Sequence, residues 1–306
     1  TKDILLAMLR AAGARAEATP GNRNTEIGVP LALLDLAEDT EIAVVEMGMR
    51  GTGQIARLAE LAPPAVACIT AIAPVHLELV GTIEAVAAAK AELLAALGDG
   101  GVADVPENEI LLEEHVAALA DGVEVRRFGD DIPDDLAIDL PFAWQRANAA
   151  AALECCRAVG HVPPPGTPIP VEFSGLRGEQ RQRASGGTVI ADCYNANPAA
   201  MEAALTDLAG RDGRTVAVLG DMFELGADEL RFHREVGERA AALGIGLVVG
   251  VGERAAEYVA AAPGGVHFAD VEAAREGLAD HIGDGDTVLL KGSRGMALER
   301  LLDIVD

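Results

Sequence analysis

The sequence predicts an α/β protein built from two successive layered domains. Short apolar runs alternate with longer amphipathic runs, an order typical of parallel strands joined by crossover helices. The 306 residues are 50% hydrophobic but only 3% aromatic, which suits layers packed from Ala, Val and Leu. A chain of this length exceeds one small core and fits two domains.

The first half of the chain predicts a mostly parallel sheet covered by helices. Strand-like runs occupy 41–48, 65–70 and 123–128, with helical patterns at 2–12, 53–61, 82–97 and 107–120. Residues 143–159 form one further helical pattern, closed by Gly160 and the proline-rich segment HVPPPGTPIP. Because proline removes amide donors and stiffens the chain, we predict a linker here, and domains of residues 1–163 and 164–306.

The second half begins a new series of strands and helices. Four apolar runs each end in a polar or Gly-rich corner followed by a helical pattern, at 188–194, 215–221, 246–252 and 286–292. Ligands of open α/β sheets gather at such carboxyl-end corners. We therefore expect functional side chains in these corners.

Charge, cysteines and hydropathy exclude several classes of protein. The 24 Lys and Arg against 49 Asp and Glu give a net charge of −25, which argues against nucleic acid as a general partner. Any anionic substrate must therefore meet locally basic residues. The four cysteines lack metal-type spacing and indicate reduced thiols of a cytoplasmic protein: Cys68, Cys155, Cys156 and Cys193. We find no signal peptide and expect no membrane span.

Lysine is scarce, since only Lys2, Lys90 and Lys291 accompany the arginines. Unlike arginine, lysine can be deprotonated and covalently modified. Each of the three is therefore a candidate for amine chemistry.

The corner VVEMGMRGTGQIA follows the run at 41–48. Glu46 ends a buried strand, where a carboxylate is costly unless it meets a cation or a donor. Gly51 and Gly53 then open a helix whose free amides could face an anion. A plain strand-to-helix turn is the favoured alternative.

His76 lies in the next corner, and Lys90 lies on the helix that follows it. A hard divalent cation prefers oxygen ligands and tolerates His as a minority partner. Lys90 would supply oxygens only if it were carbamylated, which arginine cannot be. A metal site of Glu46, His76 and Lys90 competes with the simpler reading of a surface histidine and a helix-surface amine.

The segment DCYNANPAAM places polar side chains on a strand-to-helix turn. Asn197 suits the N-cap and Pro198 the first helical position. This helix-start role accounts for neither Asp192 nor Asn195, which makes both candidates for binding.

Two further corners, LGDMFELG and KGSRG, end later strands. Lys291, Ser293 and Arg294 stand at a predicted helix start. These residue types there suit recognition of phosphate or carboxylate.

Together these corners resemble the Mur ligases. The similar segments occur in family order and cover most of the chain: TPGNRNTEIGVP, VVEMGMRGTGQIA, HLELVGTIEAVAAAKAEL, DCYNANPAAM, LGDMFELG and KGSRGMALE. YNANP, GDMFELG and KGSR point to the branch that adds D-alanyl-D-alanine to UDP-N-acetylmuramoyl-tripeptide.

The resemblance implies a central P-loop-type ATPase domain followed by a Rossmann-like carboxyl-terminal domain. It implies ATP and Mg²⁺ as cofactors and amide formation through an acyl phosphate, with D-Ala-D-Ala and the UDP-linked tripeptide as substrates. A cytoplasmic monomer is expected.

The resemblance also implies roles for individual residues by motif match. Glu46 and His76 would hold magnesium, with Lys90 as a carbamylated lysine. Asn148 matches an adenine contact, Arg177 an ATP-phosphate contact and Asp192 a ribose contact. The substrate side of the carboxyl-terminal domain would carry Asn195, Asn197, Lys291, Ser293 and Arg294.

The sequence departs from the family pattern in three ways. A Gly-rich phosphate loop is expected immediately before Thr1, leading into the helix of Lys2, and a domain for the UDP-sugar is expected before that. The stretch from about residue 100 to 147 is short and has Trp144 and Gln145 in place of a His-Asn pair. Trp144 would stack on adenine or pack as an ordinary core or surface residue.

These departures leave three hypotheses open. The chain is a piece of an active ligase, a related amide ligase acting on another amino-acid polymer, or a degenerate ligase that binds without hydrolysing ATP. GDMFELG argues against the second, and Glu46, His76 and Lys90 argue against the third.

Overall fold

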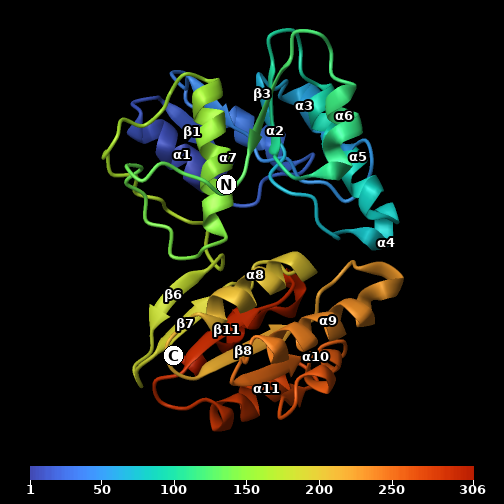
Figure 1. Ribbon diagram of the computed structural model, residues 1–306, viewed down its shortest axis with the longest axis vertical. Helices are drawn as coiled ribbons and strands as arrows, with labels where there is room; N and C mark the ends of the chain where they lie inside the picture. The colour runs from blue at the N-terminus through green and yellow to red at the C-terminus, as the bar shows by residue number, and fades with distance from the viewer. The chain divides into compact units, whose positions relative to one another are not determined.

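The computed structural model describes residues 1–306 and confirms the α/β class (Figure 1). The chain forms two compact units, one of Thr1–Ile72 with Leu79–Ser174, the other of Ala73–Glu78 with Gly175–Asp306. The division therefore follows Ser174, whereas the sequence places it after Pro163. The proline-rich segment stays with the first unit because Ile169 packs into its core and bridges to Ile138.

The strands of the first unit form two parallel sheets. β1 (Ala16–Ala18) pairs with β2 (Ile42–Val44), while β3 (Val66–Cys68), β4 (Val102–Pro106) and β5 (Glu124–Phe128) pair in that order. The predicted parallel direction is confirmed, but the strands are split between two sheets instead of one.

Helices pack on these strands through small aliphatic side chains. α1 (Lys2–Ala11) lies against α7 (Gln145–Ala158) in a core that contains Met8 and Leu153. α5 (Ile83–Ala95) packs on β3 and β4 through Ala87 and Leu94. The other helices are α2 (Gly28–Leu34), α3 (Gln54–Leu61), α4 (Leu77–Val80) and α6 (Glu113–Ala117).

The second unit contains one six-stranded sheet in the order β10-β9-β8-β11-β7-β6. All neighbours are parallel except the edge strand β6, which is antiparallel to β7. The strands are β6 (Glu179–Gln182), β7 (Thr188–Ala191), β8 (Thr215–Gly220), β9 (Leu247–Val251), β10 (Val266–Phe268) and β11 (Thr287–Lys291).

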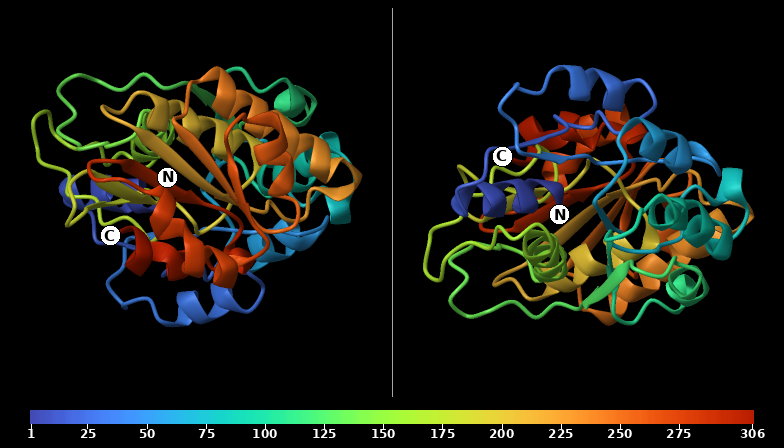
Figure 2. Two further views of the ribbon diagram at one scale, coloured as in Figure 1. Left: turned by 90° about the horizontal axis from the view of Figure 1, so that it is seen from below. Right: turned by 90° about the horizontal axis from the view of Figure 1, so that it is seen from above.

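Helices lie on both sides of this sheet (Figure 2). One core joins α11 (Val271–Gly277) and α12 (Leu302–Val305) to the sheet face that carries Val216 and Val288. The remaining helices include α8, which packs on β8 and β11. Their bounds are α8 (Pro198–Ala209), α9 (Glu229–Ala242), α10 (Ala256–Ala261), α11 (Val271–Gly277) and α12 (Leu302–Val305), with short 3-10 turns at Ile110–Leu112, Gly226–Asp228, Leu278–His281, Arg294–Met296 and Leu298–Leu301.

Because both faces of the sheet are covered, the central strands are continuous apolar runs, as parallel sheets require. Their carboxyl ends carry the polar corners found in the sequence. None of the helices combines the length and apolar character that a membrane crossing needs.

Candidate functional site

Glu46 is held in place just beyond the carboxyl end of β2. Its backbone amide donates to Oγ1 of Thr19 at 3.1 Å, and its Oε1 accepts from Nδ2 of Asn24 at 2.7 Å. Asn24 lies close because Gly48 has no side chain: a Cβ there would sit 3.0 Å from the Asn24 side chain. Oε2 of Glu46 accepts no hydrogen bond and remains free for a cation. Asn24 lies in the segment TPGNRNTEIGVP, which resembles the family, but its residue type alone does not predict this contact.

The amides at the start of α3 already meet an anion from within the chain. Glu92 on α5 accepts from the amide of Gly53 at 2.6 Å and from that of Ala56 at 3.0 Å. Gly53 adopts a left-handed φ of 85°, which glycine permits without strain. This corner is therefore a strand-to-helix turn, which is the alternative that the sequence favours. The amides of Gly53 and Ala56 already donate to Glu92 and are not available to an anionic ligand.

Lys90 lies half-buried on α5. Nζ donates to the carbonyl oxygen of Ala71 at 2.6 Å. Burial lowers the pKa of Lys90, and the nearby Glu109 carboxylate partly opposes the shift. A lowered pKa increases the neutral amine, the form that can attack carbon dioxide to give a carbamate.

His76 lies in the segment Ala73–Glu78 and belongs to the second unit. Its Nδ1 is hydrogen-bonded to the carboxylate of Glu224, and the amide of Glu78 donates to the Glu224 carbonyl at 3.3 Å. His76 and Glu224 both adopt left-handed backbone angles, with φ of 56° and 63°. Such conformations in non-glycine residues concentrate at functional sites. Nε2 of His76 makes no hydrogen bond and is free to bind a ligand.

The predicted metal ligands therefore come from both units, Glu46 and Lys90 from the first and His76 from the second. No group of three or more His, Cys, Asp or Glu side chains has a geometry suited to a metal ion. Mg²⁺ prefers oxygen ligands, and the free Oε2 of Glu46 meets this preference.

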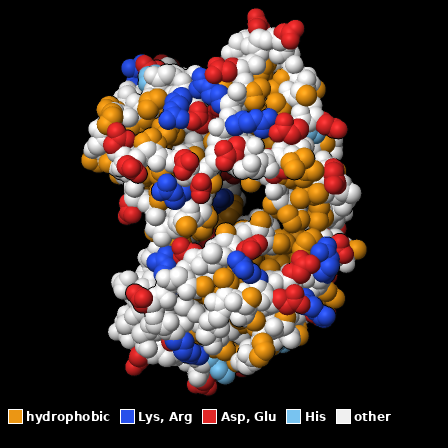
Figure 3. Space-filling model, viewed as in Figure 1, with side chains coloured by type: hydrophobic (Ala, Val, Ile, Leu, Met, Phe, Trp, Pro, Cys, Tyr) orange, Lys and Arg blue, Asp and Glu red, His pale blue; other side chains and the backbone are white.

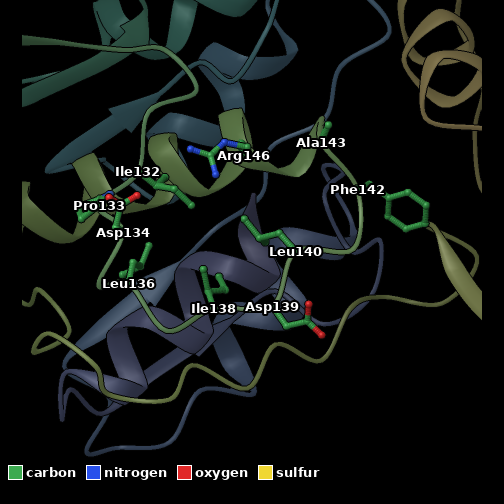
Figure 4. A pocket seen from close by; sticks show the side chains of 10 residues that line it. All are labelled: Ile132, Pro133, Asp134, Leu136, Ile138, Asp139, Leu140, Phe142, Ala143 and Arg146. Atoms are coloured by element: carbon green, nitrogen blue, oxygen red, sulfur yellow. The ribbon is translucent and has the colours of Figure 1, made fainter. Parts of the chain in front are cut away.

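Asn148 lies in the first turns of α7, where its Oδ1 accepts from the hydroxyl of Thr1 at 2.6 Å. Trp144 precedes this helix and stacks on Phe142 with ring centroids 5.6 Å apart. A pocket of about 390 Å³ opens beside them, lined by the loop from Ile132 to Leu140 and by Arg146 (Figure 4). Its lining combines the apolar side chains of this loop with three charged ones, Asp134, Asp139 and Arg146.

Lys291 is buried at the end of β11, with only 3% of its surface exposed. Its Nζ donates to Oδ2 of Asp192 at 2.6 Å and to the carbonyl of Asn195 at 3.3 Å. The ammonium is thus neutralised inside the second unit. Lys291 brings together Asp192 and Asn195, two of the residues predicted to bind ligands.

Three other predicted substrate residues have structural partners as well. Asn197 caps α8 by accepting from the amide of Ala200 at 2.9 Å, as the sequence predicts. Ser293 is buried, and its hydroxyl accepts from the amide of Phe223 at 2.9 Å. Arg294 pairs with Glu299 at 2.5 Å.

Arg177 differs from these cations because it has no carboxylate partner. Most arginines of this acidic chain form ion pairs, and acidic and basic side chains are interspersed on the face in Figure 3. Arg177 donates no hydrogen bond, and its Nε is buried without a partner. Its guanidinium lies over the ring of Tyr194, 4.2 Å from the centroid. Arg177 is therefore a cation available to an anionic ligand at the carboxyl ends of the strands.

Comparisons with known proteins show the family to which both parts of the chain are similar. Residues 1–149 match the Mur ligase middle domain, and residues 176–294 match the Mur ligase, glutamate ligase domain. The UDP-N-acetylmuramoyl-tripeptide–D-alanyl-D-alanine ligase of Escherichia coli K12 is 32% identical over 93% of this chain and 69% of the relative. The Bacillus subtilis ligase of that name is 31% identical over 100% of this chain and 73% of the relative.

Solved structures show the same similarity. MurF from Acinetobacter baumannii superposes with a TM-score of 0.89 at 27% identity, covering 100% of this chain and 74% of that one. MurF ligase from Thermotoga maritima, determined in complex with ADP, gives a TM-score of 0.86 at 28% identity, covering 99% of this chain and 76% of that one.

Proposed function

This chain belongs to the Mur ligase family, and on that basis we propose that it adds D-alanyl-D-alanine to UDP-N-acetylmuramoyl-tripeptide at the expense of ATP. The reaction would serve the synthesis of the peptidoglycan precursor and hence of the cell wall. Support comes from relatives of that name and from a structural neighbour solved with ADP.

The reaction proceeds in two steps. The terminal carboxylate of the tripeptide attacks the γ-phosphorus of ATP, which gives an acyl phosphate and ADP. The amine of D-Ala-D-Ala then attacks the acyl carbon, loses a proton, and displaces phosphate as the amide forms. Phosphoryl transfer of this kind depends mainly on positioning and charge neutralisation.

The observation that carries this proposal is the unpaired Arg177 guanidinium in a chain of net charge −25. An unpaired cation suits the phosphates of a nucleotide, and we assign Arg177 to the phosphates and Asp192 to the ribose hydroxyls. Asn148 would contact the adenine. Asn195, Asn197, Lys291, Ser293 and Arg294 would form the substrate side, where Lys291 acts through the residues it holds.

Magnesium, when bound, neutralises charge on the phosphates. The free Oε2 of Glu46, Nε2 of His76 and a carbamate on Lys90 would hold it. Asn24 keeps the Glu46 carboxylate oriented. The lowered pKa of Lys90 favours the neutral amine that carbamylation needs.

We also propose that the protein acts as a cytoplasmic monomer. Its four cysteines are free thiols, which is typical of a reducing compartment.

The test is phosphate release by the 306-residue chain with ATP, Mg²⁺, UDP-N-acetylmuramoyl-tripeptide and D-Ala-D-Ala. We expect release to require both acceptor substrates. Binding of nucleotide without any turnover would support the binding-module alternative instead.

Lys90→Arg tests the carbamate separately, because arginine keeps the positive charge but cannot be carbamylated. We expect a loss of activity, together with a ¹³C-bicarbonate-derived carbamate signal in the wild type that the variant lacks. Unchanged activity in Lys90→Arg would refute the carbamate and leave the ligase proposal standing.

A further inference from the structure

Arg177 lies on a loop that follows an unusual backbone path. The preceding residue, Leu176, has a left-handed φ of 63°. A non-glycine residue in that region costs energy and persists only when its surroundings enforce it. Two backbone hydrogen bonds do so: the amide of Tyr194 donates to the Leu176 carbonyl at 3.1 Å, and the amide of Gly178 donates to the Ala191 carbonyl at 3.1 Å.

The Tyr194 ring supplies the contact that orients the Arg177 side chain. The guanidinium has no ion pair and no hydrogen bond, and it lies 4.2 Å from the ring centroid. A long arginine side chain without such a contact samples many rotamers, and binding a ligand must then order it. Stacking on an aromatic face removes part of that cost while the N–H edge stays available.

We infer that Tyr194 is a positioning residue that holds Arg177 ready for the phosphates of the nucleotide. The inference rests on the proposed function, because it takes Arg177 as the phosphate contact. The tyrosine hydroxyl makes no hydrogen bond in the structure, so the role belongs to the ring. Tyr194→Phe is therefore a matched control for Tyr194→Leu, which keeps the apolar bulk and removes the π face.

The experiment measures the affinity of the chain for a non-hydrolysable ATP analogue with Mg²⁺ by calorimetry, in four variants and the wild type. We expect Arg177→Ala to weaken binding about tenfold or more. Tyr194→Phe should bind within about twofold of the wild type, and Tyr194→Leu should bind about three- to tenfold more weakly. In the double variant Arg177→Ala/Tyr194→Leu, the leucine should add no further loss.

The outcomes separate the two proposals. If Arg177→Ala binds as well as the wild type, the phosphate role of Arg177 in the proposed function fails. If Arg177→Ala is weak but Tyr194→Leu is not, or if the two losses simply add, the positioning role of Tyr194 is refuted.

NMR of the free protein tests the stack without any ligand. Ring currents should shift the Arg177 side-chain signals in the wild type and in Tyr194→Phe, and this shift should disappear in Tyr194→Leu. Arg177 signals that are the same in all three proteins would overturn the inference whatever the affinities are.

Discussion

Lys291 and Asp192 form a nearly buried ion pair between the ends of β11 and β7. Their side chains are 4% and 14% exposed, and Nζ lies 2.6 Å from Oδ2. Removing one partner would leave the other charge without compensation in a poorly hydrated place. The pair therefore stabilises the turn that carries Asp192 and Asn195.

We predict that Lys291→Met lowers the free energy of unfolding by about 3 kcal/mol, measured by urea denaturation. The control is Arg239→Met, which breaks the exposed pair with Glu202, where side chains are 42% and 60% exposed. That change should cost less than about 1 kcal/mol. Equal losses of unfolding free energy in the two variants would show that the buried Lys291–Asp192 pair stabilises the fold no more than the exposed pair does.

Asp104 is a second buried charge, but it lacks a compensating partner. It is fully buried in β4, and neither carboxyl oxygen accepts a hydrogen bond of normal geometry, although the Cys155 thiol lies beside it. Burial raises the pKa of Asp104 to about 6. A raised carboxyl pKa means that the folded state favours the protonated form. The loss of folding stability caused by the buried, ionised carboxylate is therefore absent below the ordinary pKa of 3.8. It grows as the pH rises to about 6 and is constant above that.

We predict that Asp104→Asn removes this pH dependence. Relative to the wild type, the variant should gain about 3 kcal/mol of unfolding free energy between about pH 3 and pH 7. Asp121→Asn changes the net charge equally at an exposed position and should show no such gain. Parallel stability curves for the wild type and Asp104→Asn would contradict the raised pKa.

The sequence predicts elements well where one physical pattern dominates them. β7, β8, β9 and β11 were found because buried parallel strands are continuous apolar runs. β4 was missed because Asp104 and Pro106 interrupt such a run. β6 was missed because its four residues, EQRQ, are all exposed and pair only through the backbone at a sheet edge.

The candidate site likewise contains some features that the sequence predicts and others that it does not. Corners that end strands could be located from the sequence, since topology brings the ends of parallel strands to one edge. The partners of their side chains could not: Asn24 with Glu46, Tyr194 with Arg177, and Glu224 with His76. Such contacts depend on loop paths, including left-handed residues, that local patterns do not encode.

The cap of α3 by Glu92 gives a prediction about local stability. The carboxylate accepts from the amides of Gly53 and Ala56, two donors that the helix itself leaves unsatisfied. We predict that Glu92→Ala lowers the unfolding free energy by about 1–2 kcal/mol. Glu92→Gln keeps one acceptor oxygen and should lose less. Hydrogen exchange at Gly53 and Ala56 would report the cap directly, and exchange unchanged in Glu92→Ala would contradict it.

His233 predicts a loss of stability in acid. The ring is buried, its Nε2 accepts from the amide of Met222 at 2.9 Å, and its Nδ1 donates to the carbonyl of Glu229 at 2.6 Å. These partners require the neutral ring with the proton on Nδ1. Burial lowers the pKa of His233, and the nearby Asp221 and Glu229 carboxylates only partly oppose this.

A lowered histidine pKa means that the unfolded chain binds the proton more readily. Stability should therefore be intact above the ordinary pKa of 6.5 and fall as the pH drops from there toward the folded-state pKa. Between about pH 7.5 and pH 5, the wild type should lose more unfolding free energy than His233→Gln, which cannot be protonated. His115→Gln, on α6 in the other unit, should keep the wild-type slope. Protonation would remove the acceptor role of the His233 ring, so the variant should differ from the wild type in this pH range. If unfolding free energy falls with the same slope in His233→Gln, another group controls the acid transition.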